Sequence, residues 1–293
     1  MKKSCFFLLL ALQTSLSLAT AVIQTTELIP VKGRFKTQND PTDIYLPSSA
    51  EKRLPVLVIL QGAQVDKSHY STFAIGIAKK GAVVAVANHH SFLGKNYTSQ
   101  KVVESVWKTI LKLNQTRASA LFGMIDSHSL FVLGHSYGGI AAMNLAAKRC
   151  QPPTCFGKET TPKALRGSLT FGFFNHQRTD NQVPVMMLQG SLDDLKKAQK
   201  TFQRIANAPK YLMTILGANH FAITNENNPT GAIPDKAEPE LDQTQGLDLL
   251  ASLTHHFITA FSANASLDAP KTLNAWEKAD FVRMEKATTR LDY

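Results

Sequence analysis

Runs of β-branched and other apolar residues alternate along this chain with segments in which apolar residues recur at helical spacing. The run PVLVILQG, from Pro55 to Gly62, is continuous and ends at a glycine, which is typical of a strand buried on both faces. The segment from Gln100 to Phe122 instead repeats apolar residues every three or four positions, which predicts an amphipathic helix. By the same criteria, strands are expected at residues 43–46, 55–62, 82–90, 129–134, 167–174, 183–190 and 211–217, and helices at 69–80, 100–122, 140–147, 195–206 and 247–261.

The alternation of strands and helices predicts an α/β fold with a mostly parallel central sheet and helices on both faces. We expect one domain over residues 22–263, because α/β folds often use such a length as a single unit. A charged tail follows at residues 264–293, with one further helix expected around residues 276–285. In such sheets the functional groups gather at the carboxyl ends of the strands. The residues that follow each apolar run are therefore the candidates for chemistry.

The first 21 residues have the pattern of an export signal. A basic start at residues 2–3 precedes an apolar run at 6–12 and a small-residue cleavage pattern at 19–21. Cleavage is expected before Val22, which would make the mature protein secreted or periplasmic. The apolar run is too short for a membrane anchor, so no stable membrane insertion is expected.

Two cysteines, Cys150 and Cys155, remain after the signal. In an oxidising compartment this close pair predicts a disulfide across the turn that Pro152 and Pro153 impose. A metal site is the alternative, but further Cys or His ligands are missing nearby in the sequence, so no metal is expected.

The formal net charge is +10, with the basic residues scattered along the chain. Basic runs with interleaved aromatic residues, which nucleic-acid binding would favour, are absent from the sequence. The charge therefore indicates solubility, and no nucleic-acid partner is expected.

The stretch GHSYG fits the G-x-S-x-G pattern and places Ser136 between a predicted strand and a predicted helix. A nucleophile elbow holds its serine in a strained backbone, and side chains at Gly134 and Gly138 would collide there. The N–H groups that begin the following helix favour negative charge at the turn. Ser136 is therefore the expected nucleophile.

A serine nucleophile needs a base, and the base needs an orienting acid, in the chain order Ser, Asp or Glu, His. Asp193 and Asp194 follow the strand VPVMMLQG, and we favour Asp193, with Asp194 as the alternative acid. The aspartate outside the triad is expected to cap the helix that follows. His220, in a loop after the last predicted strand, is the expected base.

The other histidines carry weaker signals. His135 flanks the serine, but its side chain is expected to point away from Ser136. His89 and His90 end a strand and could line the cleft, although neighbouring strand residues face opposite sides and chelate one metal poorly.

An oxyanion hole normally combines the N–H after the serine with one from the loop after an early strand. Here these are the N–H groups of Tyr137 and Ala63, with Gln64 as the fallback donor.

Together, the segments LQGAQVDKSHY, GHSYGG, LQGSLDD and GANHFAITNENNPTGAIPD resemble the α/β-hydrolase superfamily. They are most similar to its chlorophyllase-like, platelet-activating-factor-acetylhydrolase-like and dienelactone-hydrolase-like exported esterases, with bacterial cutinases more distant. The resemblance covers residues 54–261, and it departs from many relatives at Gln61, where they have histidine. The resemblance implies cleavage of an ester bond and leaves the identity of the ester open.

These observations predict an exported serine hydrolase that cleaves small-molecule or lipid-like esters through an acyl-enzyme, without a cofactor. A peptidase or amidase on the same triad is one alternative, and a non-catalytic binding protein with the hydrolase fold is another. The polar insert at residues 224–243 is expected to be a solvated surface loop; shaping of the cleft and cation binding by its acids are the other readings. Acyl length, alcohol and oligomeric state stay open.

Overall fold

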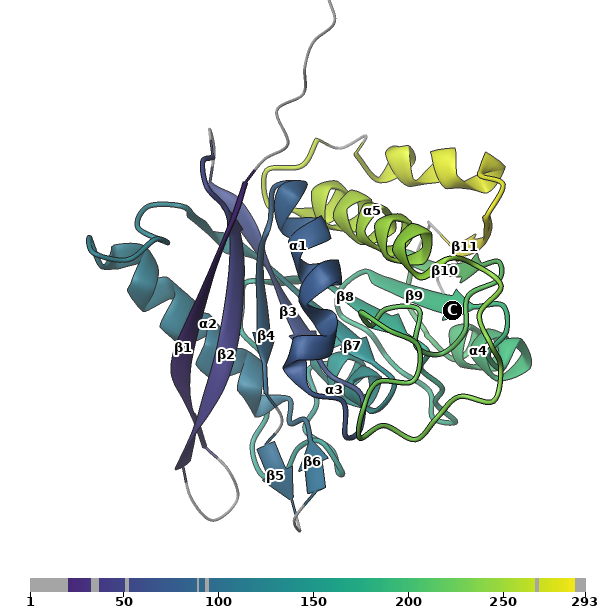
Figure 1. Cartoon of the computed structure of the whole chain (residues 1–293), viewed down its shortest axis with the longest axis horizontal. Coiled ribbons are helices and arrows are strands. Elements are labelled where there is room, and N and C mark those ends of the chain that lie inside the picture. The colour runs from purple at the N-terminus through teal and green to yellow at the C-terminus, as the bar shows by residue number, and fades with distance from the viewer. Residues whose placement is uncertain are drawn as a thin grey trace, which may run out of the picture.

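The computed structural model of the chain describes residues 21–32, 37–50, 53–88, 90–92, 95–266 and 269–287. Within them the chain forms a nine-stranded sheet, flanked by helices, and a separate two-stranded sheet (Figure 1). The strands are β1 (Val22–Lys32), β2 (Thr37–Pro47), β3 (Leu54–Leu60), β4 (Val83–Ala87), β5 (His90–Phe92), β6 (Lys95–Tyr97), β7 (Ile125–His135), β8 (Leu165–Phe171), β9 (Val185–Gly190), β10 (Lys210–Ile215) and β11 (Val282–Ala287). The helices are α1 (Ser71–Lys79), α2 (Lys101–Gln115), α3 (Tyr137–Ala146), α4 (Leu195–Gln203) and α5 (Gln243–Phe261), with 3₁₀ helices η1 (Lys67–Tyr70) and η2 (Ala269–Lys278). Apart from Ala21, the expected signal peptide lies outside the described residues.

The large sheet has the strand order β1-β2-β4-β3-β7-β8-β9-β10-β11. In this order the neighbouring strands from β4 to β10 pair in parallel, whereas the pairs β1–β2, β2–β4 and β10–β11 are antiparallel. The predicted mostly parallel α/β sheet is confirmed. Parallel order brings the carboxyl ends of β3, β7, β8, β9 and β10 to the same edge of the sheet, which is where its chemistry is expected.

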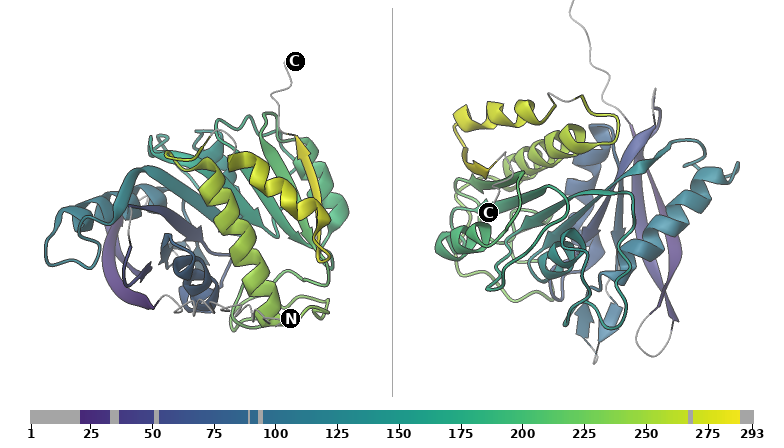
Figure 2. Two further views of the ribbon diagram at one scale, coloured as in Figure 1. Left: turned by 90° about the horizontal axis from the view of Figure 1, so that it is seen from above. Right: turned by 180° about the vertical axis from the view of Figure 1, so that it is seen from behind.

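Both faces of the sheet are covered by helices, with α1 and α5 on one side and α2, α3 and α4 on the other (Figures 1 and 2). Leu57 on β3 packs in one core with Phe73 of α1 and Phe257 of α5. Its neighbour Val58 faces the opposite side and packs in a second core with Val106 of α2. Neighbouring strand residues point to opposite faces, so a strand buried on both sides must be apolar throughout.

The edges of the sheet contain two strands that the sequence pattern did not predict. β1 pairs with the whole of β2, and along it Ile29 and Val31 are buried while Leu28 is 68% exposed. At the other edge β11 pairs with β10, where the sequence predicted a helix around residues 276–285. That expectation was wrong beyond η2, because only Val282 of β11 is fully buried and the charges on the rest of the strand resemble a solvated helix face.

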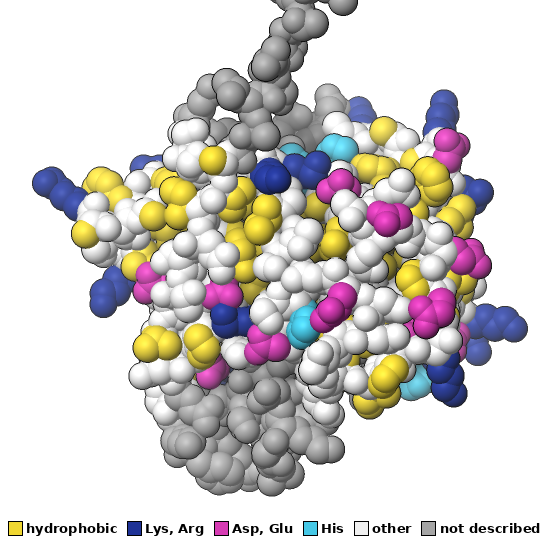
Figure 3. All heavy atoms as spheres, in the orientation of Figure 1, with side chains coloured by type: hydrophobic (Ala, Val, Ile, Leu, Met, Phe, Trp, Pro, Cys, Tyr) yellow, Lys and Arg dark blue, Asp and Glu magenta, His cyan; other side chains and the backbone are white. Residues whose placement is uncertain are grey.

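The predicted disulfide is present and joins Cys150 to Cys155 in the segment between α3 and β8. Among the described residues no helix is long and apolar enough to cross a membrane. On the face of the molecule drawn in Figure 3, basic and acidic side chains are interspersed, and the basic ones form no continuous stripe.

The carboxyl group of Asp40 on β2 is only 5% exposed, and this burial raises its pKa to about 6. The folded chain therefore keeps a proton that the unfolded chain releases near its ordinary pKa of 3.8. Stability is expected to fall, by at most about 3 kcal/mol, as the pH rises from about 4 to about 6. Asp40→Asn removes this titration, so urea unfolding should find the variant more stable than the wild type above about pH 6 and not below about pH 4. A stability difference that is the same at all pH values would contradict this account.

Candidate active site

Three side chains singled out in the sequence meet at the carboxyl ends of parallel strands. Ser136 directly follows β7, Asp193 follows β9, and His220 lies in the loop after β10. All three line one pocket of about 290 Å³. The fold thus gathers a hydroxyl, an imidazole and a carboxylate from segments far apart in the sequence.

The turn between β7 and α3 holds Ser136 at φ 50° and ψ −115°, a conformation that residues with a side chain rarely adopt. The glycines around it leave no room for side chains. A Cβ on Gly134 would lie 2.2 Å from the carbonyl oxygen of Gly138, and a Cβ on Gly138 would lie 2.2 Å from that of Leu60. This close packing lets the strand turn sharply into the helix with the serine at its tip.

Gly134→Ala is expected to lower the free energy of unfolding by about 1–3 kcal/mol and to reduce ester hydrolysis, because the added methyl group must push α3 away from β7. Gly246→Ala is the matched control, since its Cβ would meet nothing closer than 3.6 Å within α5. The control is expected to gain about 0.5–1 kcal/mol from helix propensity. Thermal unfolding of both variants checks this, and equal stabilities would contradict the tight elbow.

Asp193 and His220 are joined by a hydrogen bond of 2.8 Å between Oδ2 and Nδ1. Burial by itself would raise the pKa of Asp193, but hydrogen bonds from His220 and from the backbone N–H of Asp194 outweigh it and leave the pKa below its usual value. A carboxylate that stays ionised at this place holds the histidine Nδ1 proton and leaves Nε2 as the atom that can accept one.

The neighbouring aspartate has a different position. Asp194 is the N-cap of α4, where its carboxylate accepts the N–H of Lys197 at 3.0 Å and pairs with the ammonium group of that lysine. The structure therefore brings Asp193, and not Asp194, to His220.

The loop after β3 contains the expected oxyanion donor. Ala63 lines the pocket beside Ser136, and Tyr137 is the first residue of α3, where backbone N–H groups point toward the turn. Gln61 is buried and donates its side-chain amide to the carbonyl of Ala87. This bond ties the loop to the end of β4.

Tyr70 was not singled out in the sequence and no role was assigned to His135, but both lie next to the site. His135 is fully buried, with Nδ1 at 2.8 Å from the hydroxyl of Tyr70 and Nε2 at 2.9 Å from the backbone carbonyl of His220. Tyr70 ends η1 and gives no signal in the sequence, because its contact with His135 spans 65 positions. His89 and the side chain of His90, which were candidates for lining the cleft, lie outside the described part of the structure.

The polar insert lies against the pocket and contributes to its wall. Asp235 accepts the backbone N–H of His220 at 2.8 Å, and Asn225 accepts the N–H of Thr72 at 3.0 Å. Ile233 also lines the pocket and is 78% exposed. The insert is thus hydrogen-bonded to both the histidine loop and α1, and it shapes the cleft.

No group of three or more His, Cys, Asp or Glu side chains that could hold a metal occurs among the described residues. Two acids of the insert accept hydrogen bonds, Asp235 from the backbone N–H of His220 and Glu238 from the side-chain amide of Asn227.

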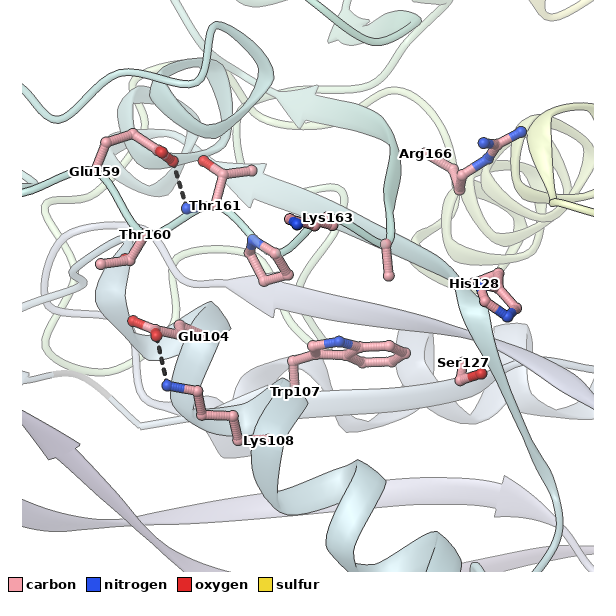
Figure 4. A pocket seen from close by; sticks show the side chains of 12 residues that line it. Glu104, Trp107, Lys108, Ser127, His128, Glu159, Thr160, Thr161, Lys163 and Arg166 are labelled. Atoms are coloured by element: carbon pink, nitrogen blue, oxygen red, sulfur yellow. Dashed lines mark hydrogen bonds and ion pairs between the residues drawn. The ribbon is translucent and has the colours of Figure 1, made fainter.

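A second hollow, of about 560 Å³, lies at the amino-terminal ends of β7 and β8, away from Ser136 (Figure 4). Its two acids are both engaged, as Glu104 pairs with Lys108 and Glu159 accepts the N–H of Thr161. Figure 4 shows both of them across Trp107 from His128. Among the lining residues no acid stands beside the histidine, so this hollow is a poor candidate for hydrolysis.

A serine at the strained tip of a strand–helix turn, at the carboxyl edge of a mostly parallel sheet, defines the chain as an α/β-hydrolase. A family model described as PETase, PET hydrolase-like, matches residues 38–234, which is more than half of the chain. The chain therefore belongs to the PET hydrolase-like family and is a serine ester hydrolase of the carboxylesterase kind. No curated protein matched the chain. The family bears out the α/β-hydrolase resemblance seen in the sequence.

Proposed function

We propose that this chain cleaves carboxylic esters through a catalytic triad of Ser136, His220 and Asp193. The observation that carries the proposal is the 2.8 Å contact of Asp193 with His220 Nδ1, in the pocket that Ser136 enters from its strained turn. A partly buried carboxylate bonded to a histidine beside a glycine-flanked serine has the arrangement that acyl transfer requires.

In this mechanism Ser136 Oγ attacks the ester carbonyl while His220 Nε2 takes its proton. Asp193 stabilises the imidazolium that forms, and the N–H groups of Ala63 and Tyr137 hold the oxyanion. His220 then passes the proton to the departing alcohol, which leaves an acyl-enzyme on Ser136. Water activated by His220 releases the acid and restores the enzyme, with no cofactor involved.

The pocket favours neutral substrates with an apolar acyl group. Its walls carry the apolar side chains of Val65, Phe174, Phe221, Ala232, Ile233 and Pro234. The carboxylate of Asp235, which also lines the pocket, disfavours an anionic substrate by like-charge repulsion. A volume of about 290 Å³ suits a short acyl chain. The remainder of a larger ester, such as the PET that gives the family its name, would extend past Ile233.

Ile233→Ser is expected to raise the KM for p-nitrophenyl hexanoate about fivefold, because the exposed side chain loses its apolar contact with the acyl chain. The KM for p-nitrophenyl acetate should change less than about twofold, since acetate is too short to reach the side chain. Steady-state kinetics on both esters checks this. Equal changes in the two KM values would show that Ile233 lies away from the acyl chain.

A peptidase or a binding protein would require different behaviour of the same pocket. Purified protein assayed on matched p-nitrophenyl butyrate and butyryl p-nitroanilide should cleave the ester at least about 100-fold faster, measured as kcat/KM. Comparable rates would favour an amidase, and no turnover of either would favour a binding protein.

Export is part of the proposal. The disulfide between Cys150 and Cys155 supports an oxidising compartment, because such bonds persist outside the cytosol. Amino-terminal sequencing of the protein recovered from the culture medium or periplasm should begin at Val22, and a product that keeps Met1 would contradict export with cleavage.

A further inference from the structure

A chain of hydrogen bonds runs beneath the pocket from the oxyanion loop to the loop of the base. The backbone N–H of Gly62 donates to the hydroxyl of Tyr70 at 2.9 Å. The same hydroxyl lies 2.8 Å from His135 Nδ1, and His135 Nε2 lies 2.9 Å from the carbonyl of His220. Tyr70 and His135 are both fully buried, so water does not compete for these bonds.

The last acceptor in this row of hydrogen bonds, the carbonyl of His220, fixes the direction of every bond in the row. The carbonyl of His220 can only accept, so His135 Nε2 carries the proton. A neutral imidazole then offers Nδ1 as an acceptor, and the Tyr70 hydroxyl donates to it while its oxygen accepts from Gly62. Burial and the neighbouring charge of His220 hold the pKa of His135 well below its usual range, which keeps the ring neutral.

The row of hydrogen bonds begins and ends at two parts of the site whose relative position matters for catalysis. Gly62 immediately precedes Ala63, the proposed oxyanion donor, and His220 is the proposed base. A Cβ on Gly62 would lie 2.9 Å from His135 Nδ1, so the loop rests directly on the His135 ring. Asp235 accepts the backbone N–H of His220, and His135 donates to the backbone carbonyl of the same residue.

We propose that Tyr70 and His135 are positioning residues, which hold the oxyanion loop and the backbone of His220 at a fixed separation. The proposal rests on the function proposed above. The centre of the His135 ring lies 5.0 Å from that of His220, so the neutral state of His135 also avoids repulsion of the imidazolium that forms on His220 during catalysis. Neither residue touches the reacting atoms; both act through their neighbours.

Tyr70→Phe removes one hydroxyl and keeps the ring that fills the core. It is expected to lower kcat on p-nitrophenyl butyrate about 10- to 100-fold, because a small displacement of the oxyanion donor weakens transition-state binding. KM is expected to stay within about threefold, as the pocket walls are untouched. The matched control is Tyr211→Phe, another fully buried tyrosine of the same core on β10, for which kcat should stay within about twofold. Equal kcat values for Tyr70→Phe and the wild type would overturn the proposal.

A double-mutant cycle tests whether Tyr70 acts through His135. Tyr70→Phe combined with His135→Phe is expected to cost no more kcat than His135→Phe alone, because one linkage is broken in both cases. Losses that multiply would mean that the two residues act separately and would contradict the linkage.

The wild-type protein gives a test that needs no variant to be active. Nitrogen-15 NMR of the histidine rings should show one neutral, Nε2-protonated ring that does not titrate between about pH 5 and pH 8, assigned to His135 by its loss in His135→Asn. An Nδ1-protonated or titrating His135 would overturn the proposal. This measurement does not depend on turnover. An inactive protein with the expected His135 signal would contradict the proposed function but not the hydrogen bonds through Tyr70 and His135.

Discussion

Replacing Ser136 with alanine is expected to reduce kcat for ester hydrolysis about 10⁶-fold, to the level that binding and the oxyanion donors alone support. The substitution removes the only atom proposed to bond to the acyl group. It leaves the turn folded, because alanine occupies the same backbone position with a smaller side chain. Hydrolysis of p-nitrophenyl butyrate at enzyme concentrations high enough to measure the residual rate checks the size of the effect.

Ser252→Ala is the matched control for this loss. Ser252 lies within α5, where its hydroxyl bonds to the carbonyl of Asp248 one helical turn earlier, away from the pocket. Its kcat should equal that of the wild type. If Ser136→Ala keeps more than about one hundredth of the activity, another residue is the nucleophile and the proposed mechanism is wrong.

Asp193→Asn is expected to lower kcat about 10⁴-fold with little change in stability. The asparagine amide that faces His220 in place of Asp193 Oδ2 donates a hydrogen bond, so the imidazole proton moves to Nε2. A ring protonated at Nε2 cannot accept the proton of Ser136. The enzyme would then be folded and able to bind substrate, but unable to activate its nucleophile.

The adjacent aspartate provides the contrast within the same loop. Asp194→Asn keeps an N-cap of equal preference, so both kcat and thermal stability should stay near those of the wild type. Asp194→Ala should cost about 1 kcal/mol of stability through loss of the cap, and no large part of kcat. A loss of kcat in Asp194→Asn as large as in Asp193→Asn would contradict the assignment of the acid.

The centre of the fold follows directly from local patterns in the sequence. The strands β3 and β4 are buried on both faces and are apolar throughout, so each is visible in the sequence without any knowledge of its partners. The carboxyl-terminal half of β7 (Leu130–Leu133) has the same character. Edge strands lack this signature. Apart from Val282, the side chains of β11 are partly or fully exposed, and its sequence fits a solvated helix equally well.

Some residues of the site could likewise be predicted from the local sequence, whereas others depend on contacts between distant segments. Ser136 was predicted from the glycines beside it, and Asp193 and His220 were predicted from their order after strands. The hydrogen bond from His220 Nδ1 to Asp193 spans 27 positions, and the choice between Asp193 and Asp194 depended on the length of a short turn. Tyr70 and Asp235 could not be predicted, because their roles come only from contacts with loops elsewhere in the chain.

The central claim is that Ser136 is a nucleophile activated within the folded protein. The most direct measurement is reaction of the purified protein with a fluorophosphonate, followed by mass spectrometry of its peptides. The account predicts one phosphonyl group per chain, on the peptide that contains Ser136, and no labelling after heat denaturation or in Ser136→Ala. A folded wild-type protein that is not labelled, or that is labelled at another residue, would contradict it.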